Sequence, residues 1–213
     1  MNKLAFTLTA YIISISSSVF ALGDVAKGQE KSATCIGCHG VGGNSVVPTF
    51  PKLAGQHQSY LLKQLKDFKL TARKDAVMTG LVTPLSDEDM VNISAYYAAQ
   101  KTTPSIANPN ANLELGKQIY QGGKKSTGVM ACIACHGPNA KGIPTAGFPR
   151  LASQHAAYTS KQLKLFRQDS LNTQTGSTEL SRTNDERMMM INFTKNLTNE
   201  EIDAVSEYIA SLN

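Results

Sequence analysis

The chain has 213 residues, of which 41% are hydrophobic and 17% are charged, a balance typical of a folded soluble protein rather than a disordered one. The formal net charge is +5 and no run of lysine or arginine exceeds two residues, so the composition gives no support for nucleic-acid binding. The one strongly apolar stretch, at the N-terminus, is too short for a polytopic membrane protein. Because tryptophan is absent and aromatic residues are only 7%, we expect a non-protein group to help fill the core.

The first residues, 1–21, read as a secretory signal peptide. Lys3 supplies the positive charge, 4–15 the apolar region, and Val19 and Ala21 the small residues before a cleavage site that we place after Ala21. A buried helix or an uncleaved anchor is the alternative, but the run is shorter than the roughly 20 apolar residues that span a bilayer. The sequence therefore predicts export to the periplasm, an oxidising compartment.

The rest of the chain repeats itself. Segment 50–69 recurs at 148–167, with 12 of 20 positions identical at a constant offset of 98. A period near 100 residues matches one small domain per copy. Residues 101–112, rich in proline and asparagine, lie between the copies and read as an extended linker. The predicted organisation is a signal peptide at 1–21, an N-terminal domain at 22–102, a linker at 103–112 and a C-terminal domain at 113–213.

Each copy has the pattern of a helical domain. Ser86 and Thr198 are each followed three residues later by an acidic residue, which predicts a capping box at the start of a final amphipathic helix. A second helix is expected near 57–70 and 155–168, and a shorter one near Asp24 and Leu113. The Gly-rich segments 40–49 and 137–147 are expected to be loops. No alternating strand pattern is present, so the predicted fold class is all-α.

All four cysteines lie in two Cys-x-x-Cys-His motifs, the signature of covalent c-type haem attachment. Residues three apart share one face of a helical turn. Two thiols can therefore bond the vinyl groups of one porphyrin while the adjacent imidazole reaches the iron from the same side. We predict two covalently bound haem c groups. The predicted attachment residues are Cys35, Cys38, Cys132 and Cys135, and the predicted proximal iron ligands are His39 and His136.

Three other uses of these cysteines are weaker. Structural disulfides suit the compartment but do not require a histidine after each pair. A zinc site needs four ligands, and each copy offers two cysteines and that histidine nearby. A thioredoxin-like redox pair expects a strand before the helix, and no strand is predicted.

The repeat also selects the ligands for the opposite face of each iron. Met78 lies seven residues before Leu85 at the final helix of the first copy, and Met190 lies seven before Leu197 in the second. Methionine opposite histidine raises the reduction potential of a c-type haem. The choice in the second copy is less secure, because Met188 and Met189 precede Met190 directly.

Two duplicated histidines, His57 and His155, are the rival sixth ligands. Bis-histidine ligation would make a low-potential carrier, whereas the alternative is an ordinary histidine at a helix start, which we prefer.

Other duplicated residues are expected to support the haems. A backbone carbonyl after the motif can fix the proximal imidazole through its far nitrogen. Two arginines upstream of the methionines are candidates to pair with haem propionates, or else are solvated surface charges. The carbonyl candidates are Pro51 and Pro149, with Pro48 and Pro144 as alternatives, and the arginines are Arg73 and Arg182.

With these motifs, the Pro-x-Leu-Ala-x-Gln segment after each haem motif and a tyrosine near each end (Tyr96 and Tyr208), the chain resembles the cytochrome c4 family over essentially its whole mature length. The resemblance implies two class I cytochrome c domains related by pseudo-twofold symmetry, each with a His/Met haem. It also implies a periplasmic electron carrier, often associated with the inner membrane, between a quinol-oxidising cytochrome bc complex and a terminal oxidase. Insertions at 121–129 and near 169–182 depart from a regular repeat and leave the domain interface and partner docking open.

The predicted function is electron transfer by a diheme protein that is not an enzyme. A diheme peroxidase is the alternative from the enzyme class, and it needs an open iron site, which the matching methionines argue against. A haem subunit of a dehydrogenase or oxidase complex is the third possibility.

Overall fold

A computed structural model of the protein describes residues 23–213, and the predicted signal peptide lies outside them. Within this range the chain is helical, and its β-structure consists of two isolated bridges, Lys124 with Val129 and Ile143 with Phe148. The all-α prediction is confirmed. None of the helices between residues 23 and 213 has the length and apolar character needed to cross a membrane.

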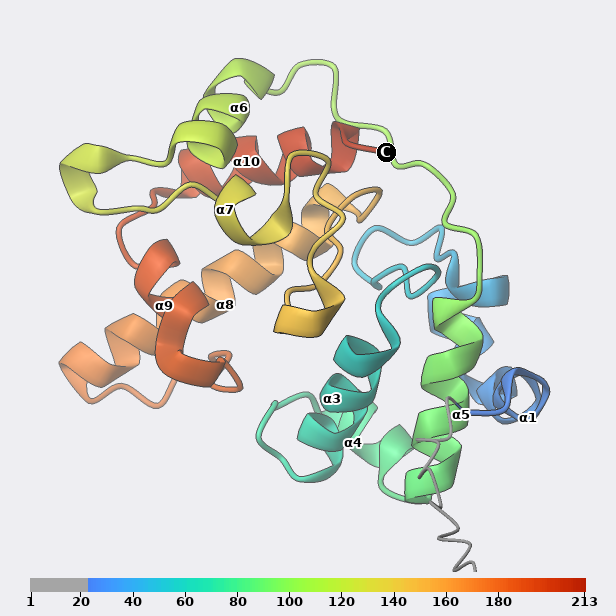
Figure 1. The fold of residues 1–213 in the computed structure, drawn as a ribbon. Coiled ribbons are helices and arrows are strands. Elements are labelled where there is room, and N and C mark those ends of the chain that lie inside the picture. Colours follow the sequence, from blue (N-terminus) through green and yellow to red (C-terminus); the bar gives the residue numbers. More distant parts are fainter. Residues whose placement is uncertain (1–22) are drawn as a thin grey trace, which may run out of the picture.

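The two repeats build the same order of helices on either side of an extended linker (Figure 1). The first repeat contains α1 (Val25–Lys31), α2 (Ile36–His39), α3 (Gln58–Lys69), α4 (Ala76–Val82) and α5 (Asp87–Ala98). The second contains α6 (Leu113–Gly122), α7 (Ile133–His136), α8 (Ala156–Thr175), α9 (Met189–Thr194) and α10 (Asn199–Ser211). Short 3-10 turns at Ser32–Cys35, Val41–Gly43, Lys125–Thr127, Pro144–Ala146 and Glu186–Met188 complete the described elements.

In each repeat the first and last helices cross at a glycine. A Cβ atom on Gly28 of α1 would lie 2.0 Å from the backbone oxygen of Asn92 in α5. A Cβ atom on Gly116 of α6 would lie 2.2 Å from the backbone oxygen of Ala204 in α10. Only glycine allows so close an approach of two backbones, and the crossing places each haem motif, which follows the first helix, beside the last helix.

The final helices begin where the capping boxes were predicted. In α5 the Ser86 hydroxyl accepts from the Asp89 amide at 3.1 Å, and the Asp89 carboxylate accepts from the Ser86 amide at 3.0 Å. Thr198 and Glu201 make the same reciprocal pair at 3.2 and 2.8 Å before α10. Local hydrogen bonding therefore determines where both helices start.

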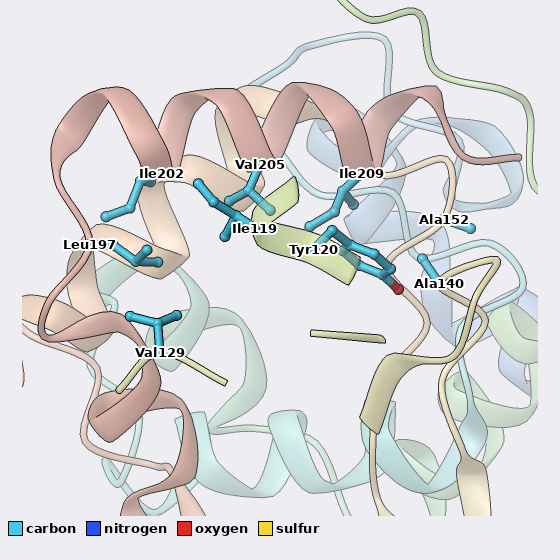
Figure 2. Packing of buried hydrophobic residues seen from close by; sticks show 9 residues of the cluster. All are labelled: Ile119, Tyr120, Val129, Ala140, Ala152, Leu197, Ile202, Val205 and Ile209. Carbon is cyan, nitrogen blue, oxygen red and sulfur yellow. The ribbon is translucent and has the colours of Figure 1, made fainter. Parts of the chain in front are cut away.

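Each repeat has its own apolar core. That of the second repeat lies between α6 and α10 and includes Tyr120 and Ile202, neither of which has any exposed surface (Figure 2). The first repeat buries a smaller cluster of Leu61, Ile93, Tyr96 and Tyr97, and Cys35 packs against it. The attachment motif is thus part of the core boundary rather than of the outer surface.

Two details of the predicted secondary structure were wrong. Met78 and Met190 lie in short helices, α4 and α9, which are missing from the predicted elements. The Asp75 carboxylate starts α4 by accepting from the Met78 amide at 3.0 Å, a capping bond between residues close in sequence. In addition, α8 continues to Thr175, well past the expected end at Gln168, because the polar run is still helical and stops only at Gly176 in a left-handed conformation.

The repeats pack against each other through reciprocal hydrogen bonds. Gln56 Nε2 donates to the Arg150 carbonyl at 2.8 Å, and its Oε1 accepts from the Arg150 amide at 2.9 Å. Gln154 makes the equivalent pair with the backbone of Lys52, both bonds at 2.9 Å. Because these four bonds exchange in pairs when the repeats are exchanged, this part of the interface has pseudo-twofold symmetry.

Candidate haem sites

The two attachment motifs form single helical turns. Cys38 and His39 lie in α2, with Cys35 ending the 3-10 turn before it, and Cys132 directly precedes α7. All four cysteines are half-buried and none forms a disulfide in residues 23–213. Burial raises the pKa of the Cys132 thiol to about 11. Each pair therefore presents two half-buried sulfurs on one helical turn, the spacing that thioether formation to one porphyrin needs.

The proximal histidines are buried and held by backbone carbonyls. His39 Nδ1 lies 2.9 Å from the Pro51 oxygen, and His136 Nδ1 lies 3.0 Å from the Pro149 oxygen. Of the carbonyls considered above, those of Pro51 and Pro149 are the ones used. A ring that donates from Nδ1 to a carbonyl presents an unprotonated Nε2 to a metal.

The electrostatic setting of these rings suits metal binding. Burial lowers the pKa of His39 and of His136, and the hydrogen bond to each proline carbonyl only partly opposes this effect. Both imidazoles are therefore neutral at pH 7, which is the form that binds iron. Phe50 and Phe148 lie tilted beside the two rings, with centroids 6.5 and 6.3 Å apart, and restrict their orientation.

The candidate methionines occupy matching positions. Met78 in α4 and Met190 in α9 are both half-buried on the short helix that precedes the final helix. Met189 is also half-buried, whereas Met188 is 47% exposed and starts α9 in a left-handed backbone conformation. The assignment of the second methionine thus stays between Met190 and Met189.

The duplicated histidines that rival the methionines contact the opposite repeat. His57 and His155 each begin a helix, α3 and α8 respectively. His57 Nε2 lies 2.9 Å from the Lys141 oxygen, and His155 Nε2 lies 2.9 Å from the Ser45 oxygen. In this structure both side chains serve the interface, as histidines at helix starts.

Arg73 and Arg182 are 8% and 7% exposed, so their interpretation as solvated surface charges was wrong. The Arg73 guanidinium donates to Gln64, Tyr158 and Gln162 at 2.7 to 2.9 Å. Arg182 donates to Gln162, Tyr60 and Gln64 at 3.0 to 3.1 Å. We call these residues the interface cluster: Tyr60, Gln64, Arg73, Tyr158, Gln162 and Arg182.

The interface cluster suits an anionic group. The hydrogen-bond acceptors of the two guanidiniums are neutral oxygens, those named above and the amide oxygen of Asn184, which is 3.0 Å from Arg182 Nε. Each guanidinium also lies over a phenylalanine ring, Phe68 or Phe166, with 4.6 and 4.4 Å to the ring centroid. Two buried positive charges with neutral partners are costly. Haem propionates are carboxylates of the kind that would offset them.

Sequence reasoning missed the role of the glutamines and histidines at the interface. Gln56 and Gln154 stood out only as part of a duplicated segment, and His57 and His155 only as rival iron ligands or helix-start histidines. Each of the four contacts backbone atoms 84 to 110 residues away. Their exact duplication next to the haem motifs was the available signal, but it did not indicate an interface.

Comparison with known protein families leads to the same class of protein as the two Cys-x-x-Cys-His motifs do. Residues 25–100 and 113–213 each match the Cytochrome c family. The paired attachment turns and the two helical repeats thus define a tandem c-type cytochrome, with one covalently bound haem c in each domain.

The similarity extends to proteins with two such domains. The chain is 44% identical over its full length to cytochrome c4 of Pseudomonas aeruginosa, and also 44% identical to that of Stutzerimonas stutzeri, with all of each relative covered. The crystal structure of reduced recombinant cytochrome c4 from Pseudomonas stutzeri superimposes with a TM-score of 0.81 at 43% identity, covering 90% of this chain and 100% of that one. The chain belongs to the cytochrome c4 family of diheme electron carriers.

Proposed function

We propose that each iron is bound by one histidine and one methionine, His39 with Met78 in the first domain and His136 with Met190 in the second. Cys35 and Cys38, and Cys132 and Cys135, form the thioethers. The observation that carries this assignment is the Nδ1 hydrogen bond from each proximal histidine to a proline carbonyl, which leaves Nε2 for the metal. The matching positions of Met78 and Met190 support the distal ligands.

The bound haems would cycle between ferric and ferrous iron, and the protein adjusts how easily they do so. The carbonyls of Pro51 and Pro149 make the proximal imidazoles better donors by accepting from Nδ1. Methionine ligands and an apolar surrounding favour the ferrous state. The interface cluster supplies two buried positive charges that would pair with propionates, and it joins the two sites in one hydrogen-bonded network.

We further propose that the protein is a periplasmic carrier with the domain boundaries given above. It would pass electrons from a cytochrome bc complex to a terminal oxidase without bond chemistry on a substrate, free or at the inner-membrane surface. The predicted signal peptide at 1–21, which precedes the described residues, supports a periplasmic location. Docking to redox partners is expected to be small and transient, below about 1,200 Å² in total.

A second role, as electron acceptor of a dehydrogenase, has a specific observation in its favour. The chain is 32% identical over 87% of its length to a protein named thiosulfate dehydrogenase electron acceptor from Thiomonas intermedia. Stopped-flow mixing of the oxidised protein with a purified bc complex or with a thiosulfate dehydrogenase separates the two roles. Fast reduction by the bc complex supports the respiratory route, and fast reduction by the dehydrogenase alone supports the second role.

The ligand set is tested by optical spectroscopy of the ferric holoprotein. We expect two haems per chain, low-spin spectra and a near-infrared sulfur-to-iron charge-transfer band. Met78→Leu and Met190→Leu should each remove about half of that band, whereas Met189→Leu and Met188→Leu should leave it intact. Loss of the band in Met189→Leu instead moves the second ligand to Met189, and a high-spin signal in the native protein favours the peroxidase alternative.

A further inference from the structure

Tyr97 of α5 is buried to 2% exposure, yet its hydroxyl has no hydrogen-bond partner among residues 23–213. A buried hydroxyl without a partner destabilises the folded state, because it has lost its hydrogen bonds to water. Such a group in a native core therefore calls for an explanation. No other buried side-chain nitrogen or oxygen of the described chain is left without a partner.

The hydroxyl lies at the attachment motif of the first domain. Cys35 packs against the cluster that contains Tyr97. Burial, followed by the neighbouring Cys35 thiol, raises the pKa of Tyr97. The nearby Ser32 hydroxyl donates to the Gln29 carbonyl at 2.8 Å, and its oxygen can still accept a further hydrogen bond. The Tyr97 hydroxyl therefore has an unused donor and two acceptors near it, the Cys35 sulfur and the Ser32 oxygen, and the Ser32→Ala variant described below distinguishes them.

The second repeat fills the same space from the opposite helix. Tyr120 of α6 takes the position that Ser32 has in the first repeat, and Ile209 takes that of Tyr97. Both buried tyrosines contact equivalent rings: Tyr97 lies 5.1 Å from Tyr96, and Tyr120 lies 5.5 Å from Tyr208. A tyrosine therefore lies next to each attachment motif, but in the first repeat it comes from the last helix, α5, and in the second repeat from the first helix, α6.

The exchange changes what the hydroxyl does. Tyr120 donates to the Gly137 carbonyl at 2.6 Å, just after the second haem motif, and its ring and hydroxyl lie near Ala140 in Figure 2. In the first repeat the residue equivalent to Ala140 is Gly43, where a Cβ atom would be 2.7 Å from the Tyr97 ring. The glycine therefore makes room for Tyr97, so the arrangement is built on more than one residue.

We propose that Tyr97 is a positioning residue for the N-terminal haem, whose hydroxyl donates to the Cys35 sulfur when that sulfur is the thioether of the attached cofactor. The inference rests on the proposed haem sites. Thioether sulfur is a weak acceptor. The hydrogen bond withdraws electron density at one edge of the porphyrin and favours the ferrous state. The second haem has no such bond, since the Tyr120 hydroxyl is already used, and the two haems are therefore inequivalent by construction.

The test is Tyr97→Phe in the holoprotein. The reduction step of the N-terminal haem should shift to lower potential while that of the C-terminal haem stays in place, each followed through the NMR signals of its own haem methyl groups. The unfolding midpoint should also fall, because a made hydrogen bond is lost. An unchanged N-terminal potential with an unchanged or higher midpoint would mean that the hydroxyl is simply unpaired, and would overturn the proposal.

Matched variants exclude other causes. Tyr96→Phe removes a hydroxyl from the neighbouring ring and should move neither potential. Tyr120→Phe should lower stability through the lost bond to Gly137 without shifting the N-terminal step. Ser32→Ala tests whether Ser32 is the acceptor instead, and a potential shift equal to that of Tyr97→Phe would overturn the assignment to Cys35.

If the Tyr97→Phe protein does not mature, the reduced native holoprotein decides the matter. A slowly exchanging hydroxyl proton of Tyr97 with a nuclear Overhauser contact to the Cys35 methylene protons supports the bond, and its absence overturns it. The optical spectrum of the native protein reports the ligand set independently, so failure of the haem assignment is seen there and not in the Tyr97 comparison.

Discussion

The Nε2 atom of His57 lies 2.9 Å from the backbone carbonyl oxygen of Lys141, in the loop that follows the haem motif of the other repeat. The reciprocal bond joins His155 to Ser45. Each repeat thus holds the loop that shapes its partner's haem site. Loss of packing between the repeats would therefore disturb both sites together, which ties the stability of the interface to the chemistry of the haems.

Replacing both histidines, as His57→Ala with His155→Ala, should weaken the interface. Each hydrogen bond contributes about 0.5–1.5 kcal/mol, so the double variant should unfold at distinctly lower denaturant concentration. Limited proteolysis of the linker, 103–112, should also become faster. Lys141→Ala is the matched control, because it keeps the accepting carbonyl, and it should behave like the native protein. Equal stability of the double variant and the control would show that the two bonds do not hold the interface.

The interface cluster should show strong coupling between its arginines. Arg73→Lys and Arg182→Lys keep the charge but cannot reach several acceptors with one planar fork. Since Gln64 and Gln162 accept from both guanidiniums, the two substitutions should be non-additive, with a coupling of about 0.5–3 kcal/mol in a double-mutant cycle by denaturant unfolding. Arg187→Lys, on an exposed side chain, provides the control. Strict additivity would contradict the shared network.

The helix crossings should tolerate no side chain. Gly28→Ala and Gly116→Ala each force a methyl group into a backbone oxygen of the last helix, and we expect about 1–3 kcal/mol of destabilisation, as for overpacked cores. Gly37→Ala is the control, because a Cβ atom there meets nothing within 4 Å and the second repeat carries Ala134 at that position. Thermal unfolding followed by circular dichroism distinguishes them. A neutral Gly28→Ala would mean that α1 and α5 can separate at little cost.

The capping box of α10 should make stability depend on pH. Burial opposes ionisation of Glu201, but the hydrogen bond from Lys124, at 2.6 Å, and those from Thr198 lower the pKa of its carboxyl below 4.5. A lowered folded-state pKa means that the carboxylate stabilises the protein above pH 4.5, and that this contribution is lost as the pH falls through the folded value.

Glu201→Gln keeps a capping oxygen but loses the ion pair with Lys124, so it should destabilise the protein by about 0.2–1 kcal/mol at pH 7. The difference from the native protein should shrink toward pH 3, as measured by denaturant unfolding at a series of pH values. Glu200→Gln, one residue away and exposed, should show no such pH-dependent difference. A deficit that stays constant with pH would assign the effect to packing rather than charge.

The features that follow from neighbouring residues could be predicted from the sequence. The attachment motif, the capping boxes at Ser86 and Thr198 and the duplication all lie within short segments, where spacing alone brings the groups together. The helices around Met78 and Met190 escaped prediction because they are short, and because the first begins at a single capping carboxylate, Asp75, while the residue before the second provides no side-chain cap. A single capping residue is a weak signal for a helix when the surrounding segment contains many other polar residues.

What only the tertiary structure decided is the relation between segments distant in the chain. The sequence left Arg73 open between a partner of a haem propionate and a surface charge, and only the structure shows that it is buried and donates to Tyr158, 85 residues later. In an alignment of the repeats, the exchange of Tyr97 for Tyr120 shows only as two separate replacements, because the residues that compensate each other lie on different helices. Local hydrogen bonds and covalent motifs are determined by sequence spacing, whereas the burial of a charge or a hydroxyl depends on which surfaces the folded repeats bring into contact.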